Sequence, residues 1–122
     1  MAKHNLNKNV YQATLERIEL VFNEFPKVYV SFSAGKDSTV LLHMVMDYAI
    51  KHNRKVGVLL VDLEGQYKHT MDHAKNCFDL YKDHIELFWV CLPIHLRNAV
   101  SMYEPFWICW DSQAKPMWVR DL

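Results

Sequence analysis

One stretch decides the fold of this chain: Val28-Tyr29-Val30-Ser31-Phe32-Ser33-Ala34-Gly35-Lys36-Asp37-Ser38-Thr39. Its first five residues are mostly β-branched or aromatic, which is typical of a strand. Residues 33–38 are small or polar and predict a loop. Thr39–Lys51 is apolar except for a polar side chain at every fourth position, which predicts a helix that is largely buried. The stretch therefore predicts a strand, a polar loop and a buried helix in succession.

The segments around this stretch repeat the alternation of strand and helix. An amphipathic helix is predicted over Asn9–Phe25 and ends before Pro26. Further along, the pattern predicts a strand over Lys55–Val61, a helix over Tyr67–Lys82 and a strand over Ile85–Leu92. Both of these strands are apolar almost throughout, so we expect each to be covered on both faces.

Strands that alternate with helices form right-handed βαβ units around a parallel sheet. We therefore expect an α/β fold with three layers, α/β/α. The chain, residues 1–122, is expected to be one domain, with an N-terminal helix in 1–26, a βαβαβ core in 27–92 and an aromatic-rich tail in 93–122. Three strands are few for such a sheet, so we expect a sheet that is incomplete or that is half of an oligomer.

The tail is rich in Trp and Tyr and is harder to interpret. A short helix is predicted near Leu96–Met102 and a strand at Met117–Arg120. The tail carries more aromatic surface than a short segment can bury by itself, and large apolar patches mark interaction sites. We therefore expect self-association or a partner segment in contact with Tyr103–Trp118.

The composition excludes several classes of protein. The 122 residues are 51% hydrophobic and 23% charged, which excludes a disordered or low-complexity chain. Lys and Arg number 14, as do Asp and Glu, so nucleic-acid binding by bulk positive charge is not indicated. No leader or membrane-spanning run is visible, and the 3 cysteines are widely spaced, so we expect a cytoplasmic protein without disulfide bonds and without a membrane partner.

The loop Ser33–Thr39 carries the strongest chemical signal. Small residues allow a tight turn in which backbone N–H groups converge, and the following helix adds the positive end of its dipole. Three hydroxyl side chains and the ammonium group of Lys36 add further donors. We expect this loop to bind a phosphate or sulfate group. The alternative is an ordinary helix start, with Ser33 as the N-cap and with Lys36 and Asp37 merely solvated.

The loop is not a Walker A motif, because Gly35-Lys36 is followed by Asp37 and Val30 occupies the place of the first Gly. It instead resembles the PP-loop, S-G-G-K-D-S, of the ATP pyrophosphatase superfamily, which includes the phosphoadenosine phosphosulfate (PAPS) reductases. Ala34 stands where Gly is usual in that motif. We expect its methyl group to be tolerated only if the φ angle of Ala34 is negative.

Four further segments resemble the PAPS-reductase-like branch that contains immunoglobulin-binding regulator A: Val56–Tyr67, Phe88–Pro93, Leu96–Ser101 and Tyr103–Asp111. Members of that branch are longer, and the chain resembles their amino-terminal part. The resemblance implies an adenine nucleotide alpha hydrolase-like (HUP-like) fold that binds ATP or PAPS.

The resemblance also implies roles for individual residues. Lys36 and Asp37 are the expected catalytic residues, and Asp37 is the candidate for holding Mg²⁺ beside the phosphates. For Asp37, a favourable interaction with the helix N-terminus is the alternative. Arg97, after the third strand, could bind an anion as a bidentate donor, with a plain surface arginine as the alternative. For Asp62 and Glu64, the alternative is an ordinary polar loop. The expected nucleotide contacts are Ser33, Ala34, Gly35, Lys36, Asp37, Ser38, Thr39, Asp62, Glu64, Gly65, Gln66 and Arg97.

Three functions stay open. A catalytic chain is expected to direct attack on the α-phosphate with release of pyrophosphate, or to act on a sulfonucleotide. A second hypothesis is a regulator that binds the nucleotide without turnover. A third hypothesis is an inactive fragment that needs a partner chain. The reductases of the family use a cysteine in an E-C-G-[LI]-H segment, and this sequence has no such segment.

Two other patterns are interpreted as structural. His69 and His73 are four residues apart on a predicted helix, and we interpret them as exposed residues rather than as a metal pair. The tryptophans Trp107, Trp110 and Trp118 are expected in core packing or in contact with a missing segment, rather than in base stacking.

Overall fold

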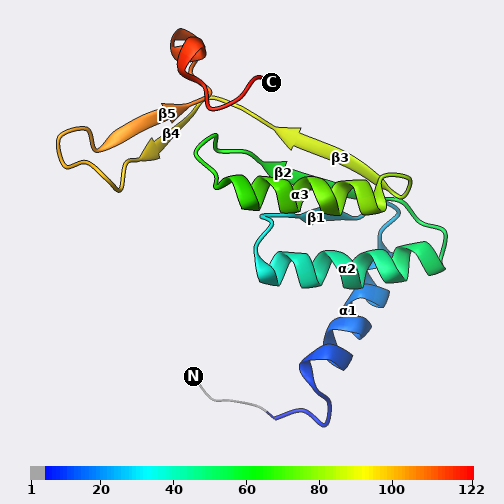
Figure 1. Ribbon diagram of the computed structural model, residues 1–122. Helices are drawn as coiled ribbons and strands as arrows, with labels where there is room; N and C mark the ends of the chain where they lie inside the picture. The colour runs from blue at the N-terminus through cyan, green and yellow to red at the C-terminus, as the bar shows by residue number, and fades with distance from the viewer. Residues whose placement is uncertain (1–4) are drawn as a thin grey trace.

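The computed structural model describes residues 5–122, so residues 1–4 of the expected N-terminal segment lie outside the described residues. Figure 1 shows three helices beside a parallel sheet and a separate hairpin near the C-terminus. The elements in chain order are α1 (Val10–Glu24), β1 (Tyr29–Ser31), α2 (Lys36–Lys51), β2 (Val56–Val61), α3 (Lys68–Tyr81), β3 (Ile85–Val90), β4 (Ile94–Arg97), β5 (Phe106–Cys109) and the 3₁₀ helix η1 (Ser112–Met117).

The strands β1, β2 and β3 form a parallel sheet in that order, which confirms the predicted α/β class. The first helix begins where the sequence indicates, because Asn9 and Gln12 form a capping box: each side chain accepts a hydrogen bond from the backbone N–H of the other. It packs against α2, where the rings of Phe22 and Tyr48 lie 5.0 Å apart.

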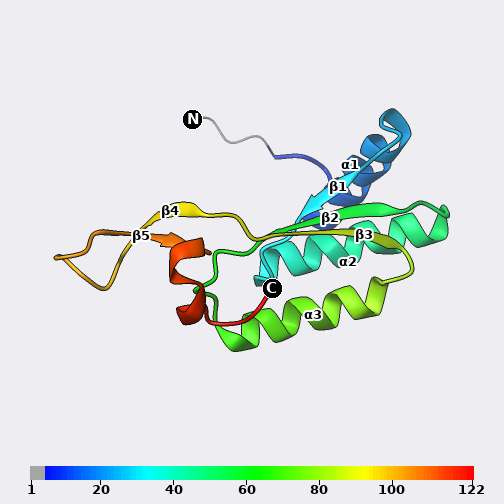
Figure 2. The same cartoon turned by 90° about the horizontal axis from the view of Figure 1, so that it is seen from above.

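The core lies between β2 and the two helices that follow β1 and β2. Both helices lie on the same side of the sheet (Figure 2), as expected when two right-handed crossovers run in the same direction. Val56 and Val58 of β2 are completely buried, as are Met46 of α2 and Ala74 of α3. The face of β2 toward these helices is therefore covered as predicted, whereas Val61 on its other face is 42% exposed, so the prediction of cover on both faces holds only in part.

The prediction that β3 is covered on both faces is wrong. Leu87 and Phe88 are 40% and 37% exposed: Phe88 lies on the sheet face away from α2 and α3, and Leu87 lies at the edge of the face that these helices cover. On the face away from α2 and α3, the ring of Tyr29 lies across Gly57, and its centroid is 5.6 Å from that of the Phe88 ring, with the two planes tilted by 49°. These two rings and Val61, which is 42% exposed, form an open apolar face of the sheet.

Both predictions for the tail are wrong. The segment expected as a helix near Leu96–Met102 begins as β4, which pairs antiparallel with β5 so that Arg97 faces Phe106. The burial of β4 alternates along the strand, as two-residue periodicity requires. The segment expected as a strand at Met117–Arg120 follows η1, which Asp111 caps by accepting a hydrogen bond from Gln113 N at 3.0 Å.

Within residues 5–122, no helix combines the length and the apolar character needed to cross a membrane.

Candidate functional site

The turn between β1 and α2 is shorter than predicted. The helix begins at Lys36 rather than at Thr39, so Lys36 to Ser38 form its first turn instead of a loop. Its N-cap is Gly35, not Ser33, and no side chain of the described residues caps it. The N–H groups of the first turn have no partner inside a helix, and they carry the positive end of the helix dipole. This geometry is suited to an anion.

The three hydroxyl groups of the turn are hydrogen-bonded mainly to the turn itself. Thr39 Oγ1 donates to Gly35 O at 2.6 Å, and Ser38 Oγ lies 3.3 Å from the same oxygen. Ser33 Oγ accepts from Gly35 N at 3.4 Å and lies 3.0 Å from Ser38 Oγ. Because Thr39 has a single hydroxyl proton, it cannot also donate to a ligand in this geometry. The hydroxyl groups therefore shape the turn more than they add donors to it.

The expectation for Ala34 is wrong, since its φ angle is 65°. The left-handed region is strained for a residue with a Cβ atom, and such strain persists only where the surroundings hold it. Here the side chain of Ala34 packs against the core, directly before Gly35. A non-glycine residue in this conformation at a predicted site agrees with the tendency of backbone strain to occur at functional sites.

Lys36 and Asp37 lie at the surface of the turn. Their side chains are 91% and 93% exposed and form an ion pair with Nζ and Oδ1 3.1 Å apart. An exposed pair of this kind adds little to stability. Both side chains are therefore free to turn toward a ligand at the helix N-terminus.

His73 belongs to this site, and the interpretation of it as an exposed helix residue is wrong. Its Nε2 lies 2.9 Å from Thr39 Oγ1, although the two residues are 34 positions apart. Since Thr39 donates its proton to Gly35 O, His73 must donate from Nε2. His69 is exposed, as expected. In the described part of the chain, no group of three His, Cys, Asp or Glu side chains could hold a metal ion.

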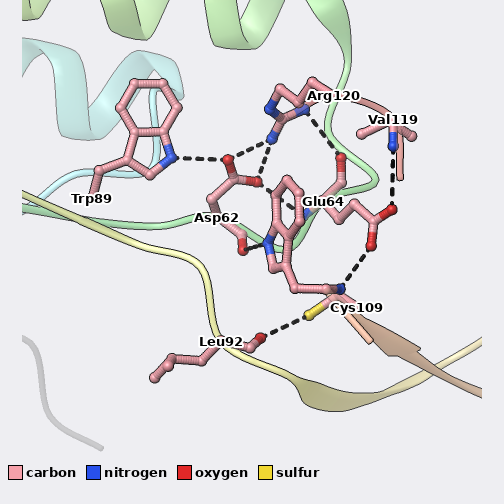
Figure 3. Close-up of polar contacts among 8 residues, drawn as sticks. Asp62, Glu64, Trp89, Leu92, Cys109, Val119 and Arg120 are labelled. Atoms are coloured by element: carbon pink, nitrogen blue, oxygen red, sulfur yellow. Dashed lines mark hydrogen bonds and ion pairs between the residues drawn. The ribbon is translucent and has the colours of Figure 1, made fainter. Parts of the chain in front are cut away.

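The second predicted region follows β2, and its carboxylates are hydrogen-bonded to other parts of the chain (Figure 3). Asp62 is 1% exposed and forms an ion pair with Arg120. It also accepts hydrogen bonds from Trp89 Nε1 at 2.8 Å and from Glu64 N at 2.9 Å. Glu64 is 8% exposed and accepts from Trp110 N at 2.7 Å. Residues of the C-terminal tail therefore bind both carboxylates: Arg120 pairs with Asp62, and Trp110 N donates to Glu64.

The environment of Asp62 lowers the pKa of its carboxyl group below the ordinary value of 3.8. Burial is the largest single influence and acts in the opposite direction. The hydrogen bonds from Arg120, Trp89 and the backbone of Glu64, together with the positive charge of Arg120, outweigh it. Asp62 is therefore ionised and paired in the folded protein.

Arg120 is the residue of this region that sequence reasoning missed. It is 58 positions from Asp62, and no local pattern marks it as a partner. A cavity of about 450 Å³ opens beside the pair and is lined by residues of α3, of the ends of β2 and β3 and of the tail: Asp62, Lys75, Trp89, Cys91, Arg120, Asp121 and Leu122.

The remaining predicted residues lie at the surface. Gly65 is exposed and Gln66 is half-buried, in a backbone turn that directly follows Glu64. Arg97 is exposed at the end of β4, in the hairpin that projects from the sheet (Figure 1). The structure therefore groups the residues of the first turn together and places Arg97 on a separate element.

The three cysteines lack the features of a reducing thiol. Burial raises the pKa of Cys77. Burial also raises the pKa of Cys91, and the nearby charge of Asp62 adds to the effect. Cys109 is completely buried, and its Sγ donates to Leu92 O at 3.3 Å. Reactive cysteines instead have a lowered pKa and are accessible.

Together, the fold and the site define an α/β domain with an uncapped helix start at the turn after its first strand. The sequence matches the family described as the phosphoadenosine phosphosulfate reductase domain over residues 27–104, so the chain belongs to that family. It is also 41% identical over 113 residues to the uncharacterized protein YbdN of Escherichia coli (strain K12). That match covers 92% of this chain and 27% of the relative, so the chain spans about a quarter of its length. No solved structure matches.

Proposed function

We propose that this chain binds ATP or the sulfonucleotide PAPS through the turn Ser33–Thr39. The observation that carries the proposal is the uncapped start of α2 at Gly35, next to the exposed ammonium group of Lys36. Nucleotide binding is typical of the family to which the chain belongs. Free N–H groups, a helix dipole and a mobile cation are the groups that hold phosphate oxygens in proteins.

The residues of the turn fit a nucleotide phosphate better than they fit a resident metal. The N–H groups of the first turn of α2 and Lys36 Nζ would hold the phosphates. Mg²⁺ usually takes only one or two protein carboxylates and completes its shell with phosphate oxygens and water. Asp37, which is almost fully exposed, could supply one such carboxylate once a nucleotide is bound.

If the chain is catalytic, the expected reaction is attack of an acceptor on the α-phosphorus. A bond forms between the acceptor and that phosphorus, the bond to the bridging oxygen breaks, and pyrophosphate leaves with the electron pair. Lys36 would stabilise the developing charge, and the turn would fix the position of the phosphates. No residue of the turn would form a covalent intermediate.

A regulator that binds the nucleotide without turnover is the second candidate. The state of the cysteines bears only on thiol-dependent reduction of a sulfonucleotide, which it does not support, because each of the three is buried or has a raised pKa. The third candidate, a fragment that needs a partner chain, agrees with the exposed apolar surface. Release of pyrophosphate from ATP by the chain alone separates the first candidate from the other two.

The variant Lys36→Ala tests the site. Loss of a charge-assisted contact to phosphate costs about 1.5–3 kcal/mol of binding free energy. Because the side chain of Lys36 is 91% exposed, the free energy of unfolding should change by no more than about 0.5 kcal/mol. Titration calorimetry with ATP–Mg²⁺ and with PAPS measures the affinity.

Lys51→Ala is the matched control, because it removes the same charge from the opposite end of α2. It should leave the affinity unchanged. Equal affinities of Lys36→Ala and the wild type for both nucleotides would show that the turn is not the binding site.

A further inference from the structure

We propose that Arg120 is a positioning residue of the nucleotide site. Through Asp62 and Glu64 it holds the backbone of 62–66, called here the β2 loop, in the conformation that faces the nucleotide. This inference rests on the proposed function and assigns a part in it to the tail of the chain.

The β2 loop is turned tightly and is strained. Glu64 has a φ angle of 66°, in the left-handed region that a residue with a side chain seldom adopts. The backbone then bends twice in succession, since Gly65 N donates to Leu63 O at 2.7 Å and Gln66 N donates to Glu64 O at 2.8 Å. Bonds between residues two positions apart make very narrow turns. Such a backbone keeps its shape only when neighbouring groups hold it.

The tail supplies the groups that hold this loop (Figure 3). Arg120 binds both carboxylate oxygens of Asp62, and its Nη1 donates to the backbone oxygen of Glu64 at 3.4 Å. The side chain of Glu64 accepts from Trp110 N at 2.7 Å and from Val119 N at 3.4 Å. The indole of Trp110 donates to Asp62 O at 2.7 Å. The loop is therefore bound to the tail through both side chains and backbone.

These contacts separate the residues of the loop into two groups. The carboxylate of Asp62 is inaccessible, and each of its oxygens is already hydrogen-bonded, so it cannot also bind a ligand in this conformation. Gly65 is exposed. We therefore assign Asp62 and Glu64 to holding the loop, and the backbone at Gly65 to contact with the nucleotide.

The β2 loop and the turn that is proposed to hold the phosphates follow neighbouring parallel strands. The backbone N–H of Phe32, directly after β1, donates to the backbone oxygen of Leu59 in β2 at 2.8 Å. Because the two strands are parallel, the chain leaves both of them at the same end of the sheet, the end formed by their carboxyl termini. Ligands of open α/β sheets bind outside these carboxyl ends of the strands. A change in the β2 loop should therefore alter the affinity for the nucleotide without any contact between Arg120 and the ligand.

The test compares Arg120→Gln with Arg120→Lys in the full chain. Amide hydrogen exchange at Gly65 and Gln66 reports the loop, calorimetry with ATP–Mg²⁺ and PAPS reports affinity, and thermal unfolding reports the fold. Arg120→Gln should accelerate exchange at both amides and weaken binding about tenfold, because part of the binding free energy is then spent on ordering the loop. Arg120→Lys keeps the charge and should recover part of both losses.

Two further variants make the result decisive. Lys115→Gln removes a positive charge from the same tail without touching the loop, and it should leave exchange and affinity unchanged. If Arg120→Gln does not fold because Asp62 is left unpaired, then Asp62→Asn/Arg120→Gln replaces the ion pair with a neutral amide pair. That double variant should fold and still show rapid exchange and weaker binding.

The outcomes separate this inference from the proposed function. If the wild type binds neither nucleotide, the proposed function fails and Arg120 has no nucleotide site to position, whatever the exchange rates are. If the wild type binds and Arg120→Gln binds equally well, this inference is overturned while the proposed function stands. Faster exchange at Gly65 with unchanged affinity also overturns it, because the loop would then not belong to the site.

Discussion

At the scale of the residue, one hydroxyl group links the candidate site to the rest of the fold. Thr39 Oγ1 donates to the N-cap carbonyl of Gly35 and accepts from His73 Nε2 on α3. The hydroxyl is thus part of the support of the turn rather than a donor to a ligand. The hydrogen bond from His73 thereby joins α3 to the start of α2.

The first prediction concerns His73. His73→Ala removes the donor to Thr39, and one lost hydrogen bond costs about 0.5–1.5 kcal/mol. We expect binding of ATP–Mg²⁺ to weaken by roughly two- to tenfold, as measured by calorimetry. His73→Gln keeps an N–H donor and should bind more tightly than His73→Ala. His69→Ala, on the exposed face of α3, is the control, and equal affinity in His69→Ala and His73→Ala would contradict the prediction.

The second prediction concerns the acid side of the stability curve. The pKa of Asp62 is lower in the folded protein than its ordinary value of 3.8. Such a group contributes stability above its unfolded pKa, and that contribution is lost as the pH falls through the folded pKa. We therefore expect urea unfolding to show a loss of wild-type stability below the ordinary pKa of 3.8.

Asp62→Asn should be less stable than the wild type near neutral pH, because Arg120 loses its charged partner. Its stability should also depend less on pH in the acid range. Asp83→Asn removes an exposed carboxyl group and is the control. If Asp62→Asn and the wild type had parallel acid profiles, Asp62 would not be the titrating group.

At the scale of the element, the close packing of β1 on β2 depends on one glycine. A Cβ atom added to Gly57 would lie 2.2 Å from Cδ1 of Tyr29, which is far too close for any contact. The ring of Tyr29 can therefore lie flat across β2 and reach Phe88 on β3 only because position 57 has no side chain. This ring pair spans all three strands of the sheet.

The third prediction is that Gly57→Ala moves the ring of Tyr29 and destabilises the sheet. Inserting a methyl group into a packed position costs about 1–3 kcal/mol, which urea unfolding would measure. Once Tyr29→Ala has removed the ring, Gly57→Ala should cost much less, so the two changes should not be additive. Additive losses in the double variant would mean that the ring and the glycine do not interact.

At the scale of the whole molecule, the chain leaves apolar surface uncovered in two places. One is the sheet face that carries the rings of Tyr29 and Phe88. The other is the tip of the β4–β5 hairpin, where Met102 and Tyr103 are 94% and 97% exposed. Both edges of the three-stranded sheet are open among the described residues, and open edges favour further pairing.

The fourth prediction is that the purified chain self-associates at high concentration and binds an apolar dye. Light scattering and dye fluorescence would measure this. Met102→Gln/Tyr103→Ser makes the hairpin tip polar without altering the core, and it should reduce both signals. A wild type that is strictly monomeric, melts cooperatively and binds no dye would mean that this surface is compatible with a stable single chain.

The sequence by itself determined the elements whose signals are local. The capping box of Asn9 and the β-branched run at β1 can each be recognised within a few residues of the chain. The turn at Gly35 could also be predicted from a few neighbouring residues, because the small residues, hydroxyl groups and lysine that suit an anion follow one another directly in the sequence. The start of α2 was the exception, because Lys36 to Ser38 have no apolar periodicity to mark them as helical.

Only the tertiary structure decided which distant segments meet. The pairs Asp62–Arg120 and Thr39–His73 join residues 58 and 34 positions apart. Residues 94–97 form the strand β4 because β5 pairs with them. The exposure of β3 depends on what packs on the two faces of the sheet, and the apolar residues of β3 do not indicate this by themselves. Hydrogen bonding and burial at these places depend on the partner that folding brings there, whereas periodicity and capping depend only on neighbours along the chain.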